Sequence, residues 1–228
     1  MATPDAVPVD YDSNPDRYRS GARLSKAYSQ ANLYARVASH LTSADLVLDV
    51  GCAEGVLREA MPDKRVIGLD MAITFLRNHP EPRVQASATA IPFQDNTFDA
   101  VTTLNMLYHL ADPTQALREA KRVLKPGGVL VASTIARSDS PEFSAYRERP
   151  PSPFDAEEAP QVVRTVFDDV EVDAWDAPLI TLPTAESIRD YLLARRVAEE
   201  AAQRAARELA VPLTVTKRGA VLIARKPA

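Results

Sequence analysis

The ten residues 46–55, LVLDVGCAEG, restrict the possible folds of this 228-residue chain more than any other segment. Residues 46–48 form a short apolar run, which predicts a buried strand. The acid Asp49 follows, and a turn then leads into a helix-like stretch. Small residues stand at alternate positions of that turn: Gly51, Ala53 and Gly55. A strand, a tight loop and a helix start in this order let the backbone approach a ligand closely.

A second apolar segment, residues 65–70, ends in Asp70, which lies 19 residues after Gly51. An acid at the tip of the next strand is well placed to accept hydrogen bonds from the hydroxyl groups of a ribose. The two segments together predict a site for a nucleoside cofactor.

Asp49 indicates which cofactor this is. Dinucleotide-binding loops have the spacing Gly-x-Gly-x-x-Gly and hold a pyrophosphate at a helix N-terminus, where a carboxylate would repel it. Here the spacing is Gly-x-Ala-x-Gly, with the acid just before the loop. S-adenosylmethionine carries a sulfonium and an ammonium group and has no phosphate. We therefore expect S-adenosylmethionine.

Residues 49–55 resemble the first motif of the class I S-adenosylmethionine-dependent methyltransferases, Asp-x-Gly-x-Gly-x-Gly. Gly51 and Gly55 match, and Ala53 replaces the middle glycine. Alanine is excluded only where the backbone requires a positive φ, so we expect the replacement to be tolerated.

The resemblance continues over residues 46–135 and is closest to small-molecule methyltransferases of the menaquinone-biosynthesis type. The matching segments are residues 86–93 (ASATAIPF), 98–101 (FDAV), 107–110 (LYHL) and 122–128 (RVLKPGG). The family often has Asp where Ser87 stands, to bind the adenine amino group. A serine hydroxyl accepts a hydrogen bond more weakly than a carboxylate, so we expect somewhat weaker cofactor binding.

The resemblance implies an α/β fold, a Rossmann-like doubly wound sheet of seven strands with an antiparallel last strand. We expect an N-terminal helical cap over residues 1–41, with 1–10 loosely attached, and a methyltransferase core over 42–228. The length suits one domain. The core would include a proline-rich loop at 138–160, extended and able to act as a lid, and a helical insert at 184–209 formed by one long helix.

Other elements follow from local signals. Asp112 and Pro113 predict a helix start, and that helix runs to about Leu124. We expect strands at 129–135 and 170–174. A hairpin or a single strand bent at Gly219 should close the chain over 214–225.

We expect the cofactor to be held by residues from five segments. Asp70 would bind the ribose, Ser87 and Ala88 the adenine, and Asn105 the methionine half. The resemblance implies that an arginine of the cap pairs with the cofactor carboxylate and that a tyrosine lies near the methyl group. We choose Arg23 over Arg19, although a solvated basic helix face would explain both. The full set of residues predicted to bind the cofactor is Asp49, Gly51, Cys52, Ala53, Gly55, Asp70, Met71, Ser87, Ala88, Asn105, Arg23 and Tyr18.

Methyl transfer depends mainly on alignment, because well-oriented groups reach effective molarities of roughly 10⁵–10⁸ M. A catalytic side chain is therefore not required. His109 is the candidate general base for a hydroxyl acceptor. The alternative is that His109 packs behind its strand. Tyr146 and Arg147 are candidates for substrate contact. The alternative is that both are exposed loop residues without a function.

Composition excludes several classes of protein. A formal charge of −4 disfavours nucleic acid as a partner. No run of eighteen apolar residues indicates a membrane span. Single Cys52 rules out an internal disulfide and suits a reducing cytoplasm. Three scattered histidines and one cysteine give no metal-ligand spacing, so we expect no metal. We expect a monomer or homodimer that acts on a small-molecule substrate.

The predicted reaction is methyl transfer from S-adenosylmethionine to a small molecule, with oxygen as the favoured acceptor atom and S-adenosylhomocysteine as product. The alternative is a protein that binds the cofactor without transferring methyl: a sensor, a partner subunit or a cofactor-assisted cyclase. A nicotinamide oxidoreductase is disfavoured by Asp49 and by the lack of a Tyr-x-x-x-Lys motif.

Overall fold

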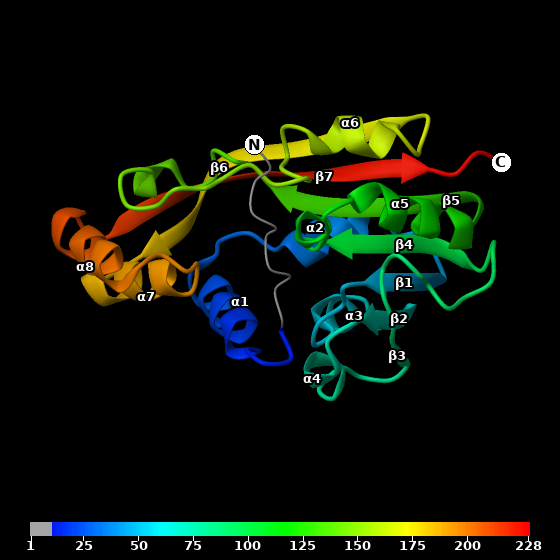
Figure 1. Cartoon of the computed structure of the whole chain (residues 1–228), viewed down its shortest axis with the longest axis horizontal. Coiled ribbons are helices and arrows are strands. Elements are labelled where there is room, and N and C mark those ends of the chain that lie inside the picture. Colours follow the sequence, from blue (N-terminus) through cyan, green and yellow to red (C-terminus); the bar gives the residue numbers. More distant parts are fainter. Residues whose placement is uncertain (1–10) are drawn as a thin grey trace.

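The computed structural model describes residues 11–228, and the expected loose attachment of residues 1–10 lies outside them. Seven strands form one sheet in the order β3-β2-β1-β4-β5-β7-β6 (Figure 1). β1 to β5 are parallel, and β7 runs antiparallel between β5 and β6. The strands are β1 (Leu46–Val50), β2 (Arg65–Asp70), β3 (Arg83–Gln85), β4 (Phe98–Leu104), β5 (Leu124–Ile135), β6 (Val170–Leu182) and β7 (Leu213–Arg225). The predicted Rossmann-like α/β fold is confirmed.

Helices cover both faces of this sheet. One hydrophobic cluster packs α5 and α6 against Leu48 and Val50, and another packs α2 and α3 against Val47. Neighbouring residues of β1 therefore point to opposite faces, and both faces are buried, which explains the uninterrupted apolar run. The helices are α1 (Asp16–Tyr28), α2 (Leu33–Ser39), α3 (Val56–Ala60), α4 (Ile73–Leu76), α5 (Pro113–Val123), α6 (Ala159–Arg164), α7 (Ala185–Leu193) and α8 (Glu199–Glu208), with 3-10 turns η1 (Leu107–His109) and η2 (Pro141–Phe143).

The predicted start of α5 at Asp112 and Pro113 is confirmed. The Asp112 side chain accepts a hydrogen bond from the backbone N–H of Thr114 at 2.8 Å, and Pro113 occupies the first turn. This cap satisfies one of the backbone donors that every helix start leaves unpaired.

The single long helix predicted for 185–209 is wrong, because the structure has two helices there, α7 and α8. The break is at Arg196, whose φ of 61° is left-handed. The Val197 N–H then donates to the Leu192 carbonyl at 3.1 Å, which closes the end of α7. Val197 packs into the hydrophobic cluster formed by α7, α8 and the outer part of β6 and β7. Tertiary packing overrides the high helix propensity of this stretch.

The strand predicted at 170–174 continues to Leu182, so its predicted length was wrong. β6 pairs with β7 along its whole length, with an irregularity near Pro178 that suits proline on an edge strand. β7 is one strand, which settles the alternative left open for 214–225. In Figure 1 the outer ends of β6 and β7 lead to the α7 and α8 lobe at the left.

The proline-rich segment 138–160 is anchored to the core. Phe143 and Phe154 are fully buried, and η2 lies within the segment. Phe154 packs in the main cluster, whereas Phe143 packs against the α7 and α8 lobe. Among the described residues, no helix is both long and apolar enough to cross a membrane.

Candidate functional site

The loop after β1 has left-handed backbone at alternate positions: φ is 75° at Gly51, 46° at Ala53 and 90° at Gly55. At Gly51 a Cβ atom would lie 2.8 Å from Met106, which follows β4. Glycine is therefore required there both by conformation and by space. The loop is held to β2 because the N–H groups of Gly51 and Cys52 both donate to the Leu69 carbonyl, at 2.7 and 3.1 Å.

Ala53 corrects one sequence-based expectation. Its replacement of glycine was expected to cause no strain, provided that φ is negative, yet φ is 46°. An L-residue with a Cβ atom pays roughly 1–2 kcal/mol for this conformation. The strain is offset by surrounding contacts, because Ala53 packs in a small cluster with Ala72 and Phe75.

Asp70 joins this loop to the end of β2. Its two carboxylate oxygens accept hydrogen bonds from the backbone N–H groups of Ala53 and Ala72, each at 2.9 Å. Burial raises the pKa of Asp70 above its ordinary value, and these backbone hydrogen bonds oppose that rise. The carboxylate therefore lies beside the loop, at the tip of the strand as the sequence indicated.

Asp49 is almost completely buried, with 3% of its surface exposed. Its Oδ1 accepts a hydrogen bond of 2.7 Å from the hydroxyl of Thr102, the residue opposite it on β4. Burial raises the pKa of Asp49 to about 7, the Thr102 hydrogen bond lowers it, and repulsion from Asp70 raises it. A positive charge beside Asp49 would favour its ionised form.

Asn105 lies just beyond β4, and its φ of 52° turns the chain sharply. The backbone N–H donates to the Ser133 carbonyl at 3.0 Å. Within residues 11–228, the side-chain oxygen Oδ1 is buried without a hydrogen-bond partner. Because β4 lies next to β1, an unsatisfied acceptor stands at the same sheet edge as Asp49.

Helix α1 contacts the loop, because its Tyr18 packs in one cluster with Ala53. The ring centroid of Tyr18 lies 4.9 Å from that of Phe75. Arg19 Nε donates to Glu54 Oε1 at 2.8 Å, which ties α1 to the loop. Burial raises the pKa of Tyr18 well above its usual range, and that of Tyr34 on α2 to about 12. Both phenols are therefore neutral hydrogen-bonding groups near Asp49.

His109 ends η1, beyond β4, and meets the beginning of the described chain. Its Nε2 lies 3.1 Å from the Tyr11 hydroxyl, and the two rings are perpendicular with centroids 5.6 Å apart. Tyr11 also packs on Phe75, at 5.3 Å between centroids. The structure thus brings His109, Tyr11 and Tyr18 together: Tyr11 and Tyr18 both pack on Phe75, and Tyr11 also contacts His109.

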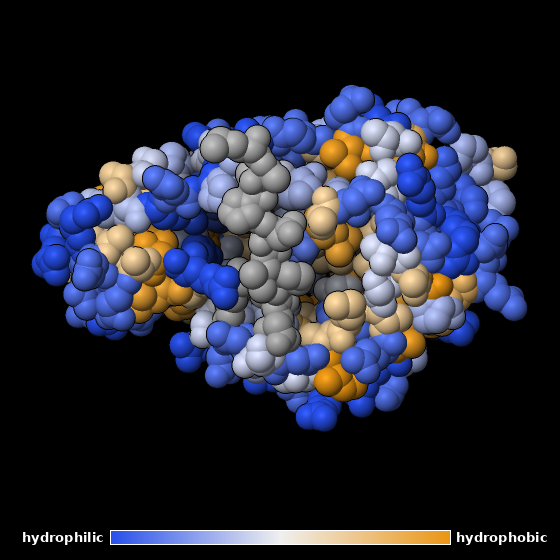
Figure 2. Space-filling model, in the orientation of Figure 1, coloured by the Kyte–Doolittle hydropathy of each residue, from blue (hydrophilic) through white to orange (hydrophobic). Residues whose placement is uncertain are grey.

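Three further predicted residues surround the end of β2 and β3. Met71 is 66% exposed and directly follows Asp70. The Ser87 hydroxyl lies 2.8 Å from that of Thr89, and Ala88 is buried. Figure 2 shows hydrophobic residues gathered at the lower edge of the molecule, where Figure 1 places α4. An apolar surface of this kind suits the face of an aromatic base.

The two arginines considered for the cofactor carboxylate differ in their surroundings. Arg19 pairs with Glu54 and is partly buried, whereas Arg23 is exposed on α1. The assignment of Arg23 stays a prediction. Cys52 is buried in the loop, and burial raises the pKa of its thiol.

Sequence reasoning missed Thr102, Tyr34 and His79. His79 is 1% exposed and packs beneath the loop, against Gly55 and Gly68. Burial lowers its pKa. Thr102 could have been found from strand register, because it lies opposite Asp49 in a parallel pair. No sequence signal identifies Tyr34 or His79.

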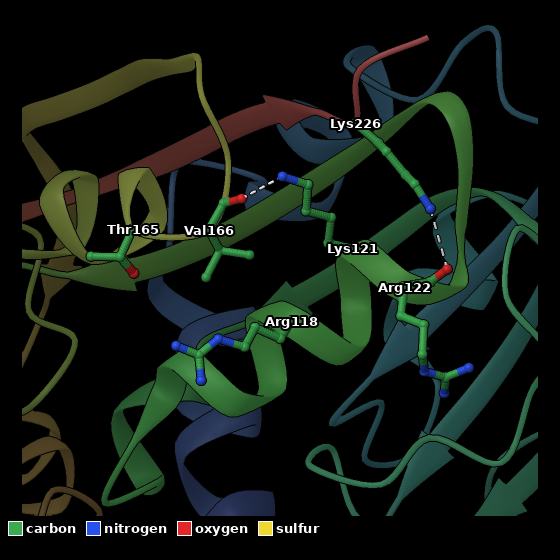
Figure 3. Close-up of a pocket in the computed structure, with 6 residues that line it drawn as sticks. All are labelled: Arg118, Lys121, Arg122, Thr165, Val166 and Lys226. Carbon is green, nitrogen blue, oxygen red and sulfur yellow. Dashed lines mark hydrogen bonds between the residues drawn. The ribbon is translucent and has the colours of Figure 1, made fainter.

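A surface pocket of about 380 Å³ lies elsewhere, between α5, α6 and the end of β7 (Figure 3). Its lining is mostly basic: Arg118, Lys121, Arg122, Thr165, Val166 and Lys226. Lys121 Nζ donates to the Val166 carbonyl at 2.6 Å, and Lys226 Nζ to the Arg122 carbonyl at 3.3 Å. The pocket borders the amino end of β5, at the edge of the sheet opposite Asp49. It is therefore separate from the candidate site.

Residues 48–132 match the family model described as a methyltransferase domain. Over this segment the chain is similar to methyltransferases. This match covers the segment from β1 to β5, which includes Asp49, Asp70, Asn105 and His109. The resemblance found in the sequence is confirmed.

Curated relatives share this domain. The chain is 39% identical over 104 residues to a ubiquinone biosynthesis O-methyltransferase of Xanthomonas oryzae pv. oryzae. This match covers 40% of this chain and 44% of that protein. A match of 38% identity over 104 residues links it to the protein of the same name in Xanthomonas campestris pv. campestris. The chain thus matches less than half the length of these relatives.

Solved structures resemble nearly the whole chain at low sequence identity. One is the [4+2]-cyclase SpnF, with a TM-score of 0.64 and 19% identity, covering 97% of this chain and 96% of that one. Another is a methyltransferase of Thermotoga maritima titled a possible histamine N-methyltransferase, with a TM-score of 0.65 and 16% identity, covering 95% and 98%. These likenesses confirm the fold.

Among residues 11–228, no group of three or more His, Cys, Asp or Glu side chains is arranged to hold a metal ion.

Proposed function

We propose that this methyltransferase domain transfers a methyl group from S-adenosylmethionine to a small-molecule acceptor, with oxygen as the favoured acceptor atom. S-adenosylhomocysteine would be the second product. The observation that carries the proposal is the buried carboxyl group of Asp49 at the tip of β1, beside the left-handed loop. A site with that acid favours a cationic nucleoside over a phosphate-bearing one.

The described residues fit this cofactor, which supplies an electrophilic methyl group on a sulfonium. Asp49 would offset its positive charge, and the unpartnered Oδ1 of Asn105 would accept a hydrogen bond from its ammonium group. The backbone of the loop from Gly51 to Gly55, including Cys52 and Ala53, would pass close to the nucleoside. Asp70 keeps lone pairs for ribose hydroxyls, because each carboxylate oxygen can accept more than one hydrogen bond.

The remaining roles are assigned by position. Ser87, Ala88 and Met71 would surround the adenine at the ends of β2 and β3. Tyr18 would close the methionine half from α1, and Arg23 would pair with the cofactor carboxylate. Closing the site in this way would exclude water, which strengthens the electrostatic contacts inside it.

His109 is the proposed proton acceptor. A neutral imidazole nitrogen of His109 would accept the proton of the acceptor O–H group when that oxygen is methylated. The Tyr11 hydroxyl, 3.1 Å from Nε2, would orient the ring. Most of the rate enhancement would still come from holding the acceptor in line with the methyl group.

The choice of oxygen and of a small molecule is supported by the relatives named as ubiquinone biosynthesis O-methyltransferases. The negative formal charge supports a partner other than nucleic acid. We also propose that the protein acts in the cytoplasm as a monomer or homodimer. The buried free thiol of Cys52 is compatible with a reducing compartment.

Two measurements test the proposal. Calorimetry should detect binding of S-adenosylmethionine and S-adenosylhomocysteine, and Asp49→Ala should abolish or greatly weaken both. The protein with methyl-labelled cofactor and a metabolite extract should then give a labelled small molecule. Binding without label transfer would favour a sensor, partner subunit or cofactor-assisted cyclase, and absence of binding by folded protein would contradict the cofactor itself.

A further inference from the structure

A second cluster of charged residues lies beyond the end of β5, outside the proposed cofactor site. Its centre is Asp139, which is 4% exposed. The Lys217 ammonium forms a salt bridge with Asp139, and Arg147 Nη2 donates to the Asp139 carbonyl at 2.6 Å. The side chains of Arg147 and Lys217 are themselves only 13% and 17% exposed. Burial alone would raise the pKa of Asp139, but Lys217 and the hydrogen bonds keep it below its ordinary value.

Arg195, which follows α7, adds a third positive charge, and Asp139 favours it electrostatically without forming a salt bridge with it. Its guanidinium carbon lies 3.4 Å from the centroid of the Tyr191 ring, and Nη1 donates to the Tyr191 carbonyl at 3.0 Å. In the part of the chain that the structure describes, Arg195 has no salt bridge. Burial lowers the pKa of Arg195, Tyr191 and Asp139 oppose this fall, and Arg147 adds to it, yet arginine remains protonated in proteins.

The charges of the cluster do not balance. Arg147, Arg195 and Lys217 contribute three positive charges, and Asp139 contributes one negative charge. Even if Glu142 is counted as fully ionised, one positive charge is left over, and Glu142 Oε1 already accepts the Thr216 N–H at 2.9 Å. A buried cation without a counterion is costly, so an anion bound at this place would stabilise it.

A second, independent observation points the same way. Tyr191 is fully buried, and among the described residues its hydroxyl has no hydrogen-bond partner. Buried hydroxyl groups are normally satisfied. Tyr191 interacts electrostatically with both Arg147 and Arg195, so this donor belongs to the same cluster. Two guanidinium groups and a hydroxyl together match the acceptors of a carboxylate.

The cluster lies on the side of the sheet where ligands bind in folds of this kind. Asp139 follows β5 at the carboxyl end of the parallel strands, as Asn105 follows the neighbouring β4. Helix α1 spans the two regions. Its Tyr18 packs on the loop after β1, and its Tyr28 packs on the α7 and α8 lobe. The helix rises about 15 Å over the ten-residue step from Tyr18 to Tyr28. Figure 1 shows α1 between this lobe and α3 and α4.

We propose that Arg195, Arg147 and the Tyr191 hydroxyl bind a carboxylate group of the methyl acceptor, so that the natural substrate is a carboxylic acid. This inference rests on the proposed methyltransferase function, because it takes the bound carboxylate to be part of the methyl acceptor. It assigns substrate selection to the α7 and α8 lobe and to the loop after β5, outside the segment that matches the family model.

The test is calorimetric titration of the protein, saturated with S-adenosylhomocysteine, with benzoate and with benzamide. Wild type should bind benzoate and should bind benzamide at least tenfold more weakly. Arg195→Gln should weaken benzoate binding by roughly tenfold or more, since hydrogen bonds to charged groups are among the strongest in proteins. Tyr191→Phe should weaken it several-fold while keeping the ring on which Arg195 stacks. The matched control is Arg189→Gln, an exposed arginine of α7 that pairs with Asp190.

Binding of S-adenosylhomocysteine by each variant, measured first, separates this inference from the proposed function. If that nucleoside binds and benzoate does not, or benzoate and benzamide bind alike, the carboxylate site is wrong and the methyltransferase function stands. Unchanged benzoate binding in both Arg195→Gln and Tyr191→Phe would also overturn it. Tyr191→Phe decides the question if Arg195→Gln fails to fold.

Discussion

Asp49 and Thr102 face each other across the β1 and β4 pair, and the Thr102 hydroxyl donates to Asp49 Oδ1 at 2.7 Å. This hydrogen bond opposes the effect of burial, which raises the pKa of Asp49 to about 7. The carboxyl group therefore changes its ionisation within the physiological pH range. A cationic cofactor would bind the ionised form in preference.

Affinity for S-adenosylmethionine should consequently increase with pH. With a pKa of about 7, Asp49 is roughly one tenth ionised at pH 6 and nine tenths at pH 8, so the dissociation constant should fall about tenfold over this range. Calorimetry at both pH values measures this. Asp49→Asn should remove the dependence, whereas Asp63→Asn, at an exposed acid, should keep it. An unchanged pH profile in Asp49→Asn would contradict the assignment.

The same pKa predicts the opposite trend for stability without cofactor. The folded pKa of Asp49 is raised above its unfolded value of 3.8, so the native state binds more protons than the unfolded state between about pH 4 and pH 7. Asp49 therefore lowers the free energy of unfolding as pH rises through this window, by up to about 4 kcal/mol. Urea unfolding should show that Asp49→Asn is more stable than wild type at pH 8 and loses this advantage at pH 4. If the free energies of unfolding of Asp49→Asn and wild type differ by the same amount at both pH values, the raised pKa of Asp49 is wrong.

Ala53→Gly should stabilise the protein. Relief of the left-handed alanine gains roughly 1–2 kcal/mol, and the greater freedom of glycine in the unfolded chain costs roughly 0.5–1 kcal/mol. We expect a net gain of about 0.5–1 kcal/mol in chemical unfolding. Ala60→Gly is the matched control, because Ala60 ends helix α3, where glycine should destabilise. A destabilised Ala53→Gly would show that the methyl contacts with Ala72 and Phe75 outweigh the strain.

The elements that the sequence predicted well carry local signals. The apolar runs of β1 and β2 are buried on both faces, and the start of α5 has a capping Asp followed by Pro. Ala53 shows where such reasoning fails. Nothing near residue 53 reveals that its φ is positive, because the conformation is imposed by contacts with Asp70 and with the loop.

Long-range packing also explains the errors at the C-terminal end of the chain. The chain turns away after α7 at a left-handed Arg196 because Val197 packs into the lobe, and no glycine marks the break. β6 continues past residue 174 because β7 pairs with it, and the partners there lie 31 to 44 positions away in the sequence. Separation in sequence likewise hides the meeting of His109 with Tyr11 and of Arg147 with Arg195.

The close packing beneath the loop gives the last prediction. A Cβ atom at Gly68 of β2 would lie 2.4 Å from His79 Nε2 and 2.8 Å from Cys52 Sγ. His79 is fully enclosed and cannot swing away, so Gly68→Ala should destabilise the protein by about 1–3 kcal/mol or more. Displacement of Cys52 should also disturb the loop and weaken S-adenosylmethionine binding. Urea unfolding and calorimetry measure the two effects.

Two comparisons make the Gly68 prediction specific. Gly21→Ala, in the middle of α1 with open space around it, should instead stabilise the protein by roughly 0.5–1 kcal/mol. Adding Gly68→Ala to a His79→Ala protein should cost less than adding it to wild type, because the ring that it strikes is gone. If the cost is the same in both backgrounds, the contact with His79 is not the cause, and strain in β2 itself must be responsible.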